Sequence, residues 1–197
     1  MILKKEFYST PWGPAQTKKE IAPGIIKVTT ASHGGILLNE ERQKEFKKVF
    51  PTFHLFCCEG AFEEDCDWAM VALAFPQFFP EDQEAAKLTV INDYPTQYEH
   101  HFKTTVTAKQ SRRRAEEKFY HENIGAWIVC TAWGDWYNSP EYGQIPKGFC
   151  LVCAKKLLNE EGKRGNEEKF YILSTAEYNA SRENSFVIRG HAEAVKI

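Results

Sequence analysis

The sequence lacks the features that would assign it to several large classes of protein. No window approaches the roughly 18 consecutive apolar residues of a membrane-spanning helix, and Met1 to Glu6 carry charges without the long apolar run of a secretory signal. We therefore expect a cytoplasmic protein with no membrane partner. Disulfides are rare in that compartment, so we expect the six cysteines to be reduced thiols.

A strong excess of charge is also missing. Lys and Arg number 25 against 27 Asp and Glu, which gives a formal net charge of -2. Such a chain has no general attraction for nucleic acid or anionic lipid. The basic run Arg112 to Arg114 is followed at once by Glu116 and Glu117, as is typical of a solvated helix face with internal ion pairs. Nucleic acid is therefore not favoured as a partner, and the sequence predicts no oligomeric state.

What remains is the composition of a globular protein without internal repeats. The 197 residues, 43% of them hydrophobic, suffice for one domain with a sizeable core or for two small ones. We predict an α+β fold. Residues 1–103 form a mainly helical part with one β-hairpin in this prediction, and residues 104–197 form a helix followed by a small antiparallel sheet. The two parts are expected to share one core.

The stretch that organises this prediction is the unbroken apolar run from Trp68 to Phe75. Leu, Met and Ala favour a helix, and a helix that is apolar on every side must be surrounded by protein. Acids before and within its first turn suit the positive end of the helix dipole. We expect a central buried helix that directs these acids outward, namely Glu63, Glu64, Asp65 and Asp67.

Short strands are expected on both sides of this helix in the sequence. Gly24 to Thr30 and Ile36 to Leu38 flank the glycine turn Ala31 to Gly35, which predicts a hairpin with His33 at its tip. Residues 1–23 show no clear pattern. In the second half, several strand-like runs follow one another with few helices between them, which favours an antiparallel sheet. These runs are Trp127 to Trp133, Gly148 to Ala154, Lys169 to Leu173 and Phe186 to Ile188.

The acids at the helix start are the first candidate site. On a helix, Glu63 and Asp67 are four residues apart and share a face, where their charges repel. A divalent metal or an acid–base role would use that arrangement, whereas dipole compensation and solubility explain it without any site. His33 on its glycine turn suits a base or a ligand, or is simply exposed. The enzyme alternative is a hydrolase, with or without a metal, that uses His33, Glu63 and Asp67 together with Asp65.

Cysteine spacing adds no metal or redox site. Cys150 and Cys153 have the spacing of zinc and redox motifs, but they fall in a predicted strand, where residues three apart face opposite ways. Cys66 lies between Asp65 and Asp67, and neighbouring acids make a poor thiolate. We predict no cofactor and no metal.

The second candidate site is an aromatic cluster at the end of a predicted strand, Ala132 to Tyr137. Clustered aromatic rings anchor a protein partner or stack on a base, while a sheet corner with buried rings explains them without a ligand. We predict binding contacts from this cluster and from the acidic helix start, namely Trp133, Asp135, Trp136, Tyr137, Glu64 and Asp65.

Four segments occur in a specific order, and together they carry a resemblance. They are Thr10 to Gln16, Ile21 to Ile25, Ser32 to Gly35 and Glu63 to Ala69. In this combination the chain resembles, over roughly residues 8–102, an uncharacterised domain family of bacterial, phage and plasmid proteins. Ala132 to Trp136 resembles a block that often follows in the same proteins.

The resemblance implies a mobile-element setting and names no catalytic residue. Small proteins in that setting often counter host defence by binding a host protein, which is an argument by association. We therefore expect a phage or mobile-element accessory protein that binds and inhibits a host defence protein or nucleoprotein complex. The hydrolase stands as the alternative.

Overall fold

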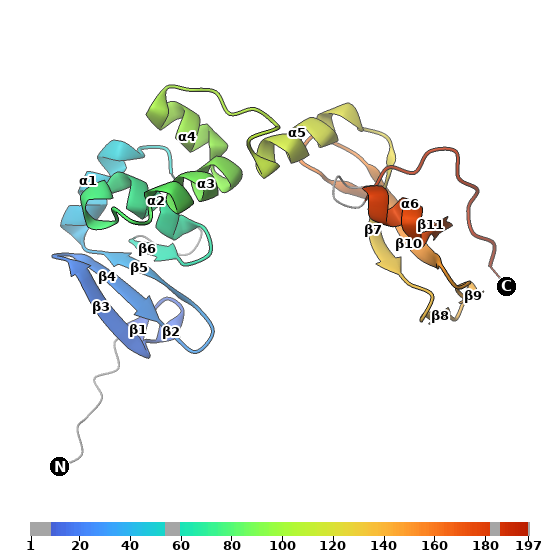
Figure 1. Cartoon of the computed structure of the whole chain (residues 1–197), viewed down its shortest axis with the longest axis horizontal. Helices are drawn as coiled ribbons and strands as arrows, with labels where there is room; N and C mark the ends of the chain where they lie inside the picture. The colour runs from blue at the N-terminus through green and yellow to red at the C-terminus, as the bar shows by residue number, and fades with distance from the viewer. Residues whose placement is uncertain (1–8, 54–59, 182–185, 197) are drawn as a thin grey trace, which may run out of the picture. The chain divides into compact units, whose positions relative to one another are not determined.

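The computed structural model describes residues 9–53, 60–181 and 186–196. The chain divides into two compact units, Met1–Arg114 and Ala115–Ile197, and both contain helices and antiparallel strands (Figure 1). The predicted α+β class is confirmed. The predicted boundary at residues 103 and 104, and a core common to both parts, stay predictions.

The first unit contains a four-stranded antiparallel sheet in the order β3-β4-β5-β6. The predicted hairpin is its centre, where Ile25 lies opposite Leu38 and Thr29 opposite Gly34. Two very short strands precede the sheet and pair with each other. The strands are β1 (Ser9–Thr10), β2 (Gly13–Pro14), β3 (Thr17–Ala22), β4 (Ile25–Thr29), β5 (Gly34–Leu38) and β6 (Ala61–Glu63).

Helices cover this sheet. They are α1 (Glu40–Val49), α2 (Asp67–Ala74), the 3-10 helix η1 (Pro76–Phe78), α3 (Gln83–Asp93) and α4 (Pro95–Phe102). Helix α2 lies deepest among them. Asn39 caps α1, because its side chain accepts a hydrogen bond from the Arg42 amide. Helix α2 contacts α1, α3, β5 and β6, and its residues Ala69 to Ala72 are completely buried. The central buried helix is thus confirmed.

The acids before α2 lie differently from the prediction. Glu63 belongs to strand β6 and not to a helix, so it shares no helix face with Asp67. Glu64 and Asp65 lie in the exposed turn between β6 and α2. Asp67 is the first residue of α2 and only 3% exposed, so the expectation that it points outward is wrong.

The second unit is a three-stranded antiparallel sheet in the order β11-β10-β7, with its core on one face. Residues at every second position of β10, namely Cys150, Val152 and Ala154, pack into that core. Its elements are α5 (Arg112–Glu122), which begins in the first unit, β7 (Trp127–Trp133), β8 (Asn138–Ser139), β9 (Gly143–Gln144), β10 (Phe149–Leu157), β11 (Arg164–Ser174) and α6 (Thr175–Ser181).

Phe186 to Ile188 does not form the fourth strand that its β-branched residues predict. Val187 makes one isolated bridge to Ile128, and Phe186 inserts its ring into the core. Hydrogen bonds from Val129 to Phe186 and from Ile188 to Trp127 hold the segment against β7. The segment is therefore a short edge contact.

Across the described parts of the chain, no helix combines the length and the apolar character that crossing a membrane requires.

Candidate functional site

His33 and Glu63 meet at one end of the first sheet. Strands β5 and β6 pair with Gly35 opposite Glu63, and this register brings the Glu63 side chain beside the residue that precedes β5. Nδ1 of His33 lies 3.5 Å from Oε1 of Glu63, and the two side chains are 52% and 31% exposed. Thr30 fixes the turn, since its hydroxyl donates to the His33 carbonyl and accepts from the His33 amide. The sequence-predicted pair is therefore close enough for an ion pair and open to solvent.

The two glycines after His33 are required by their neighbours more than by any ligand. A Cβ on Gly34 would lie 2.4 Å from Oε2 of Glu64, and a Cβ on Gly35 would lie 2.5 Å from the Trp12 ring. These positions bring an acid and an indole directly onto the backbone of β5. The glycine pair thus serves packing, while no hydrogen bond from its amides to a ligand is needed to explain it.

Asp67, the third predicted catalytic residue, faces a different set of neighbours. The Tyr94 hydroxyl donates a short hydrogen bond to Oδ1 of Asp67, and Sγ of Cys66 lies 3.0 Å from the same hydroxyl oxygen. Within the part of the chain that the structure describes, no hydrogen bond or ion pair joins Asp67 to His33. The structure therefore brings His33 to Glu63 and leaves Asp67 in the core.

Burial governs the chemistry around Asp67. Desolvation raises the pKa of the Tyr94 hydroxyl, and the hydrogen bond to Asp67 raises it further. Desolvation also raises the pKa of the Cys66 thiol, to which Asp67 and other nearby acids add. Both groups keep their protons at neutral pH, so this cluster offers neither a thiolate nucleophile nor a phenolate base.

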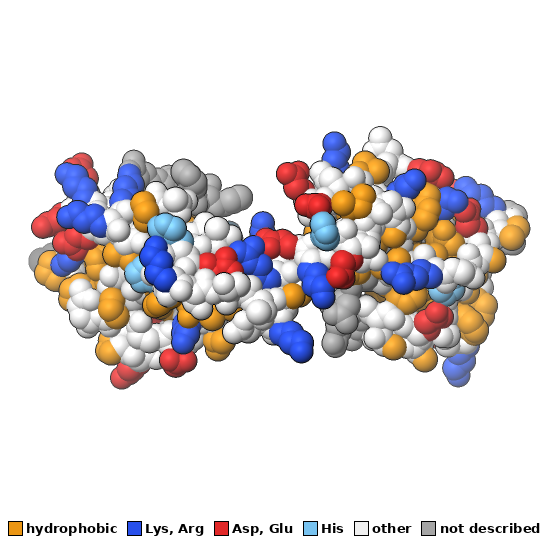
Figure 2. All heavy atoms as spheres, turned by 90° about the horizontal axis from the view of Figure 1, so that it is seen from above, with side chains coloured by type: hydrophobic (Ala, Val, Ile, Leu, Met, Phe, Trp, Pro, Cys, Tyr) orange, Lys and Arg blue, Asp and Glu red, His pale blue; other side chains and the backbone are white. Residues whose placement is uncertain are grey.

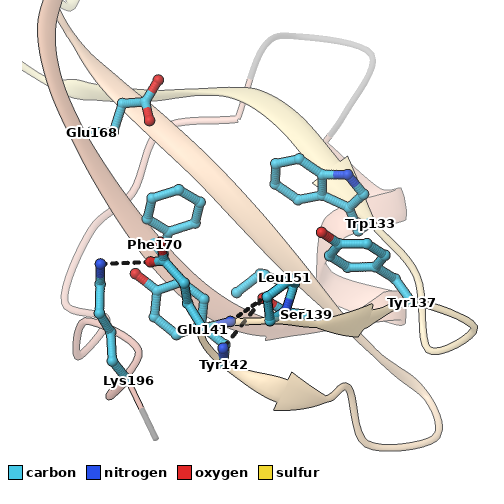
Figure 3. A pocket seen from close by; sticks show the side chains of 10 residues that line it. Trp133, Tyr137, Ser139, Glu141, Tyr142, Leu151, Glu168, Phe170 and Lys196 are labelled. Atoms are coloured by element: carbon cyan, nitrogen blue, oxygen red, sulfur yellow. Dashed lines mark hydrogen bonds and ion pairs between the residues drawn. The ribbon is translucent and has the colours of Figure 1, made fainter.

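A pocket of about 530 Å³ lies on the second unit, beside the predicted aromatic cluster (Figure 3). Trp133 and Tyr137 stack with ring centres 5.7 Å apart and planes inclined by 22°. Phe170 stacks on the other side of the pocket, 6.4 Å from Trp133, and Tyr142 lies 5.0 Å from Phe170. Trp133 and Tyr137 were predicted from the sequence; Tyr142 and Phe170 were not.

Charged side chains border these rings. Nζ of Lys196 lies 2.5 Å from Oε2 of Glu141 and 5.9 Å from the centre of the Tyr142 ring. Glu168 lies at the other end of the pocket and pairs with Lys155 at 3.0 Å. The pocket therefore has aromatic walls with a carboxylate at each end, and each carboxylate already pairs with a lysine.

The turn after β7 places these residues. The Tyr137 amide donates to the Gly134 carbonyl at 3.0 Å, which closes a tight turn directly after Trp133. The Asp135 carboxylate accepts a hydrogen bond from the Gly148 amide at 3.0 Å, and so it holds the loop before β10. Trp136 points into solvent, 76% exposed. Asp135 thus has a structural contact, and most of the Trp136 side chain is open to solvent.

The remaining surface carries no extended patch of one charge on the face seen in Figure 2, where Lys and Arg are interspersed with Asp and Glu. The arginine run forms ion pairs with neighbouring helices, because Arg112 pairs with Asp93 of α3 at 2.6 Å and Arg114 with Glu99 of α4 at 2.5 Å.

The predicted acidic contacts Glu64 and Asp65 are exposed in the first unit. Over the described ranges, no three His, Cys, Asp or Glu side chains gather as a metal site would require.

Sequence reasoning missed Glu141, Tyr142, Glu168, Phe170 and Lys196 because they come from separate segments of the chain. Each is an ordinary residue of a strand, a turn or a tail in the sequence, and only the sheet brings them together. Alternation along β11 was the available signal, since Phe170 faces away from the core that holds Tyr171.

The comparisons with known proteins match the chain to a family but not to an individual protein. No curated protein and no solved structure matches the chain. A family model described as a domain of unknown function, DUF7007, matches residues 5–124. That range contains His33, Glu63 and Asp67 and ends before the aromatic pocket. The chain belongs to the DUF7007 family.

Proposed function

We propose that the protein is a cytoplasmic accessory protein of a phage or other mobile element, which binds a host defence protein or nucleoprotein complex and inhibits it. The single observation that carries this proposal is the aromatic pocket of the second unit, beside the exposed Trp136. Aromatic side chains dominate the energy of protein interfaces because they bury a large area at a small entropic cost.

The pocket suits an arginine side chain of the partner. A guanidinium stacks flat on aromatic rings and pairs with carboxylates through two parallel hydrogen bonds. Trp133 and Phe170 supply rings inclined by only 21°, and Glu141 and Glu168 supply the carboxylates. The pairing of Lys196 with Glu141 over the Tyr142 ring is an internal example of a cation at this place.

Trp136 extends the proposed contact beyond the pocket. Its ring lies 5.9 Å from that of Tyr137 and is inclined to it by 67°, so the two form one continuous aromatic edge. If a partner inserts an arginine beside Trp133, the partner's surface around that arginine would cover Trp136. Glu64 and Asp65 of the first unit offer further acidic contacts for a basic partner.

The test is affinity capture from the host with three versions of the full chain. The wild type and Leu158→Ala, a control at a 48% exposed apolar residue outside the pocket, should retain the same stoichiometric partner. Trp133→Ala combined with Trp136→Ala should lose it, along with inhibition of the purified partner. Equal capture by all three versions would contradict the proposal.

The occupant of the pocket is tested separately with short peptides. An oligo-arginine peptide should perturb the NMR signals of Trp133 and Tyr137, and an oligo-glutamate peptide should not. Glu141→Gln with Glu168→Gln should weaken the arginine response. If the oligo-arginine peptide perturbs the NMR signals of other residues only, the pocket is not the arginine site.

One observation favours a second candidate, a hydrolase. Nδ1 of His33 is 3.5 Å from Oε1 of Glu63, so the carboxylate can orient the imidazole ring. Nε2 of the same ring can then remove a proton from water. Chromogenic esters and phosphodiesters, with and without Mg²⁺, would then be cleaved by the wild type and by the control Glu84→Gln, at an exposed acid of α3. His33→Ala and Glu63→Gln would lower the rate. No cleavage by the wild type, or full cleavage by His33→Ala, eliminates this candidate.

A further inference from the structure

Two cysteines from neighbouring strands lie side by side in the second unit. Sγ of Cys130, on β7, is 3.8 Å from Sγ of Cys153, on β10. The Cys130 thiol also donates to the Cys153 carbonyl at 3.2 Å. In sequence these residues are far apart, and nothing in their spacing suggests a pair.

A β-bulge produces this contact. Cys153 pairs with Thr131 and the next residue, Ala154, pairs with Val129, so Cys130 is the extra residue of β7. A bulge leaves its extra residue unpaired and changes the direction of its side chain. Here the change brings the Cys130 thiol alongside that of Cys153.

The pair differs from the motif that the sequence offers, Cys150 to Cys153. Cys150 belongs to the buried cluster on one face of the sheet, where its thiol faces the Leu173 carbonyl at 3.7 Å. Cys153 lies outside that cluster, next to Cys130. The prediction that Cys150 and Cys153 face opposite ways agrees with these contacts, and the partner of Cys153 is on the neighbouring strand.

The two thiols have different access to solvent. Cys130 is exposed, whereas Cys153 is 4% exposed. Burial, with the neighbouring Cys130 as a second cause, raises the pKa of the Cys153 thiol to about 12. An oxidant from solution therefore reaches the Cys130 thiol first. The Cys153 thiol is buried beside Cys130 and keeps its proton at neutral pH. An exposed thiol beside a resolving cysteine is the usual arrangement at sites of reversible oxidation.

We propose that Cys130 and Cys153 are a site of reversible thiol modification, at which hydrogen peroxide converts the pair into an intramolecular disulfide. The Cys130 thiolate attacks one peroxide oxygen, the O–O bond breaks, and sulfenic acid and hydroxide form. Cys153 sulfur then attacks Sγ of Cys130, the S–O bond breaks, and hydroxide leaves with the Cys153 proton as water. Overall, two thiols lose two electrons and two protons, and one peroxide becomes two waters.

The geometry permits the bond. The two sulfurs are 3.8 Å apart, and a disulfide bond is about 2.05 Å long, so they must approach by roughly 1.8 Å. The same reaction runs backwards with a dithiol reductant such as dithiothreitol. The pair is thus reduced at rest in a reducing compartment and oxidised when peroxide rises.

The experiment treats the full chain with peroxide, blocks the remaining thiols by alkylation and maps its peptides by mass spectrometry. The expected product is a peptide pair joined through Cys130 and Cys153, with a mass loss of about 2 Da that dithiothreitol reverses. Cys150→Ser, the matched control on the same strand, should give the same linked pair. Cys130→Ser should give none.

Peptide mapping also separates this bond from others in the chain. Cys57 and Cys58 lie outside the described residues, and a link that involves them would appear in different peptides. Because Cys153 is buried, the exposed Cys130→Ser is the decisive variant and Cys153→Ser a second one. Oxidation of Cys130 to sulfinic acid without a linked pair, or a link between other cysteines only, would overturn the proposal.

Discussion

Replacing Tyr94 by Phe tests whether Asp67 serves the fold or a reaction. The change removes the hydroxyl that donates to a carboxylate which is only 3% exposed. The ring stays, and so does its edge contact with Phe53 at 5.0 Å, so no cavity forms. Loss of a hydrogen bond to a charged group costs about 1.5–3 kcal/mol. We expect the free energy of unfolding of Tyr94→Phe to fall by that amount.

The assay is urea unfolding of the full chain, followed by circular dichroism, in a double-mutant cycle with Asp67→Asn. Residues that share one hydrogen bond couple by about 0.5–3 kcal/mol, so the double variant should lose less than the two single losses together. Tyr120→Phe is the matched control. Its hydroxyl bonds Glu116 at 2.7 Å on the surface, and its loss should cost less than about 0.5 kcal/mol.

Two outcomes would refute this reasoning. A cost for Tyr94→Phe no greater than that of the surface control would mean that the hydrogen bond does not stabilise the buried carboxylate. Additive losses in the cycle would mean that Tyr94 and Asp67 act independently. Either result would again make Asp67 a candidate catalytic residue.

Three further outcomes follow from burial. Gly35→Ala should destabilise the first unit by about 1–3 kcal/mol, measured by urea unfolding, because its Cβ would lie 2.3 Å from the Phe62 carbonyl; an unchanged midpoint would contradict it. Leu173→Ala, at a 1% exposed position, should cost about 2–5 kcal/mol in the same assay, and a cost below 1 would show a poorly packed sheet. Burial against Phe50 lowers the pKa of His101, so the folded protein favours the neutral imidazole. The stability that the neutral ring contributes is complete above the pKa of His in the unfolded chain, about 6.5. That stability is lost as the pH falls toward the lower pKa of His101 in the folded protein. Unfolding midpoints between pH 8 and 5 should show this loss in the wild type and not in His101→Gln.

The central helix and the hairpin were predictable because their signals are local. An unbroken apolar run such as Trp68 to Phe75 has one stable place, inside the protein. A glycine turn between two β-branched runs has one simple pairing, which β4 and β5 adopt. Strand β3 escaped prediction because its sequence is polar and mostly exposed, so it shows no alternation.

The candidate sites were predictable where a short run of sequence marks them, as at Ser32 to Gly35 and at Ala132 to Tyr137. The prediction that Glu63 is helical was wrong, because Ala61 to Glu63 form strand β6 and pair with β5 before α2 begins. Pairing within the sheet overrides the local helix propensity of these residues. Asp67 was expected outside because a charge is costly to bury, but a hydroxyl donor 27 residues later compensates for that cost. The pocket and the Cys130–Cys153 pair depend on strand register, which single-residue patterns do not encode.

The ion pair of Lys196 with Glu141 has a consequence for selectivity. A ligand tethered to its own site is present at a high effective concentration, so an incoming cation binds only by displacing the tail. Under the proposed function, weak ligands would lose that competition, and a partner that also covers Trp136 would win it. In the proposed complex, the tail would thus raise the affinity that an arginine of the partner needs in order to occupy the pocket.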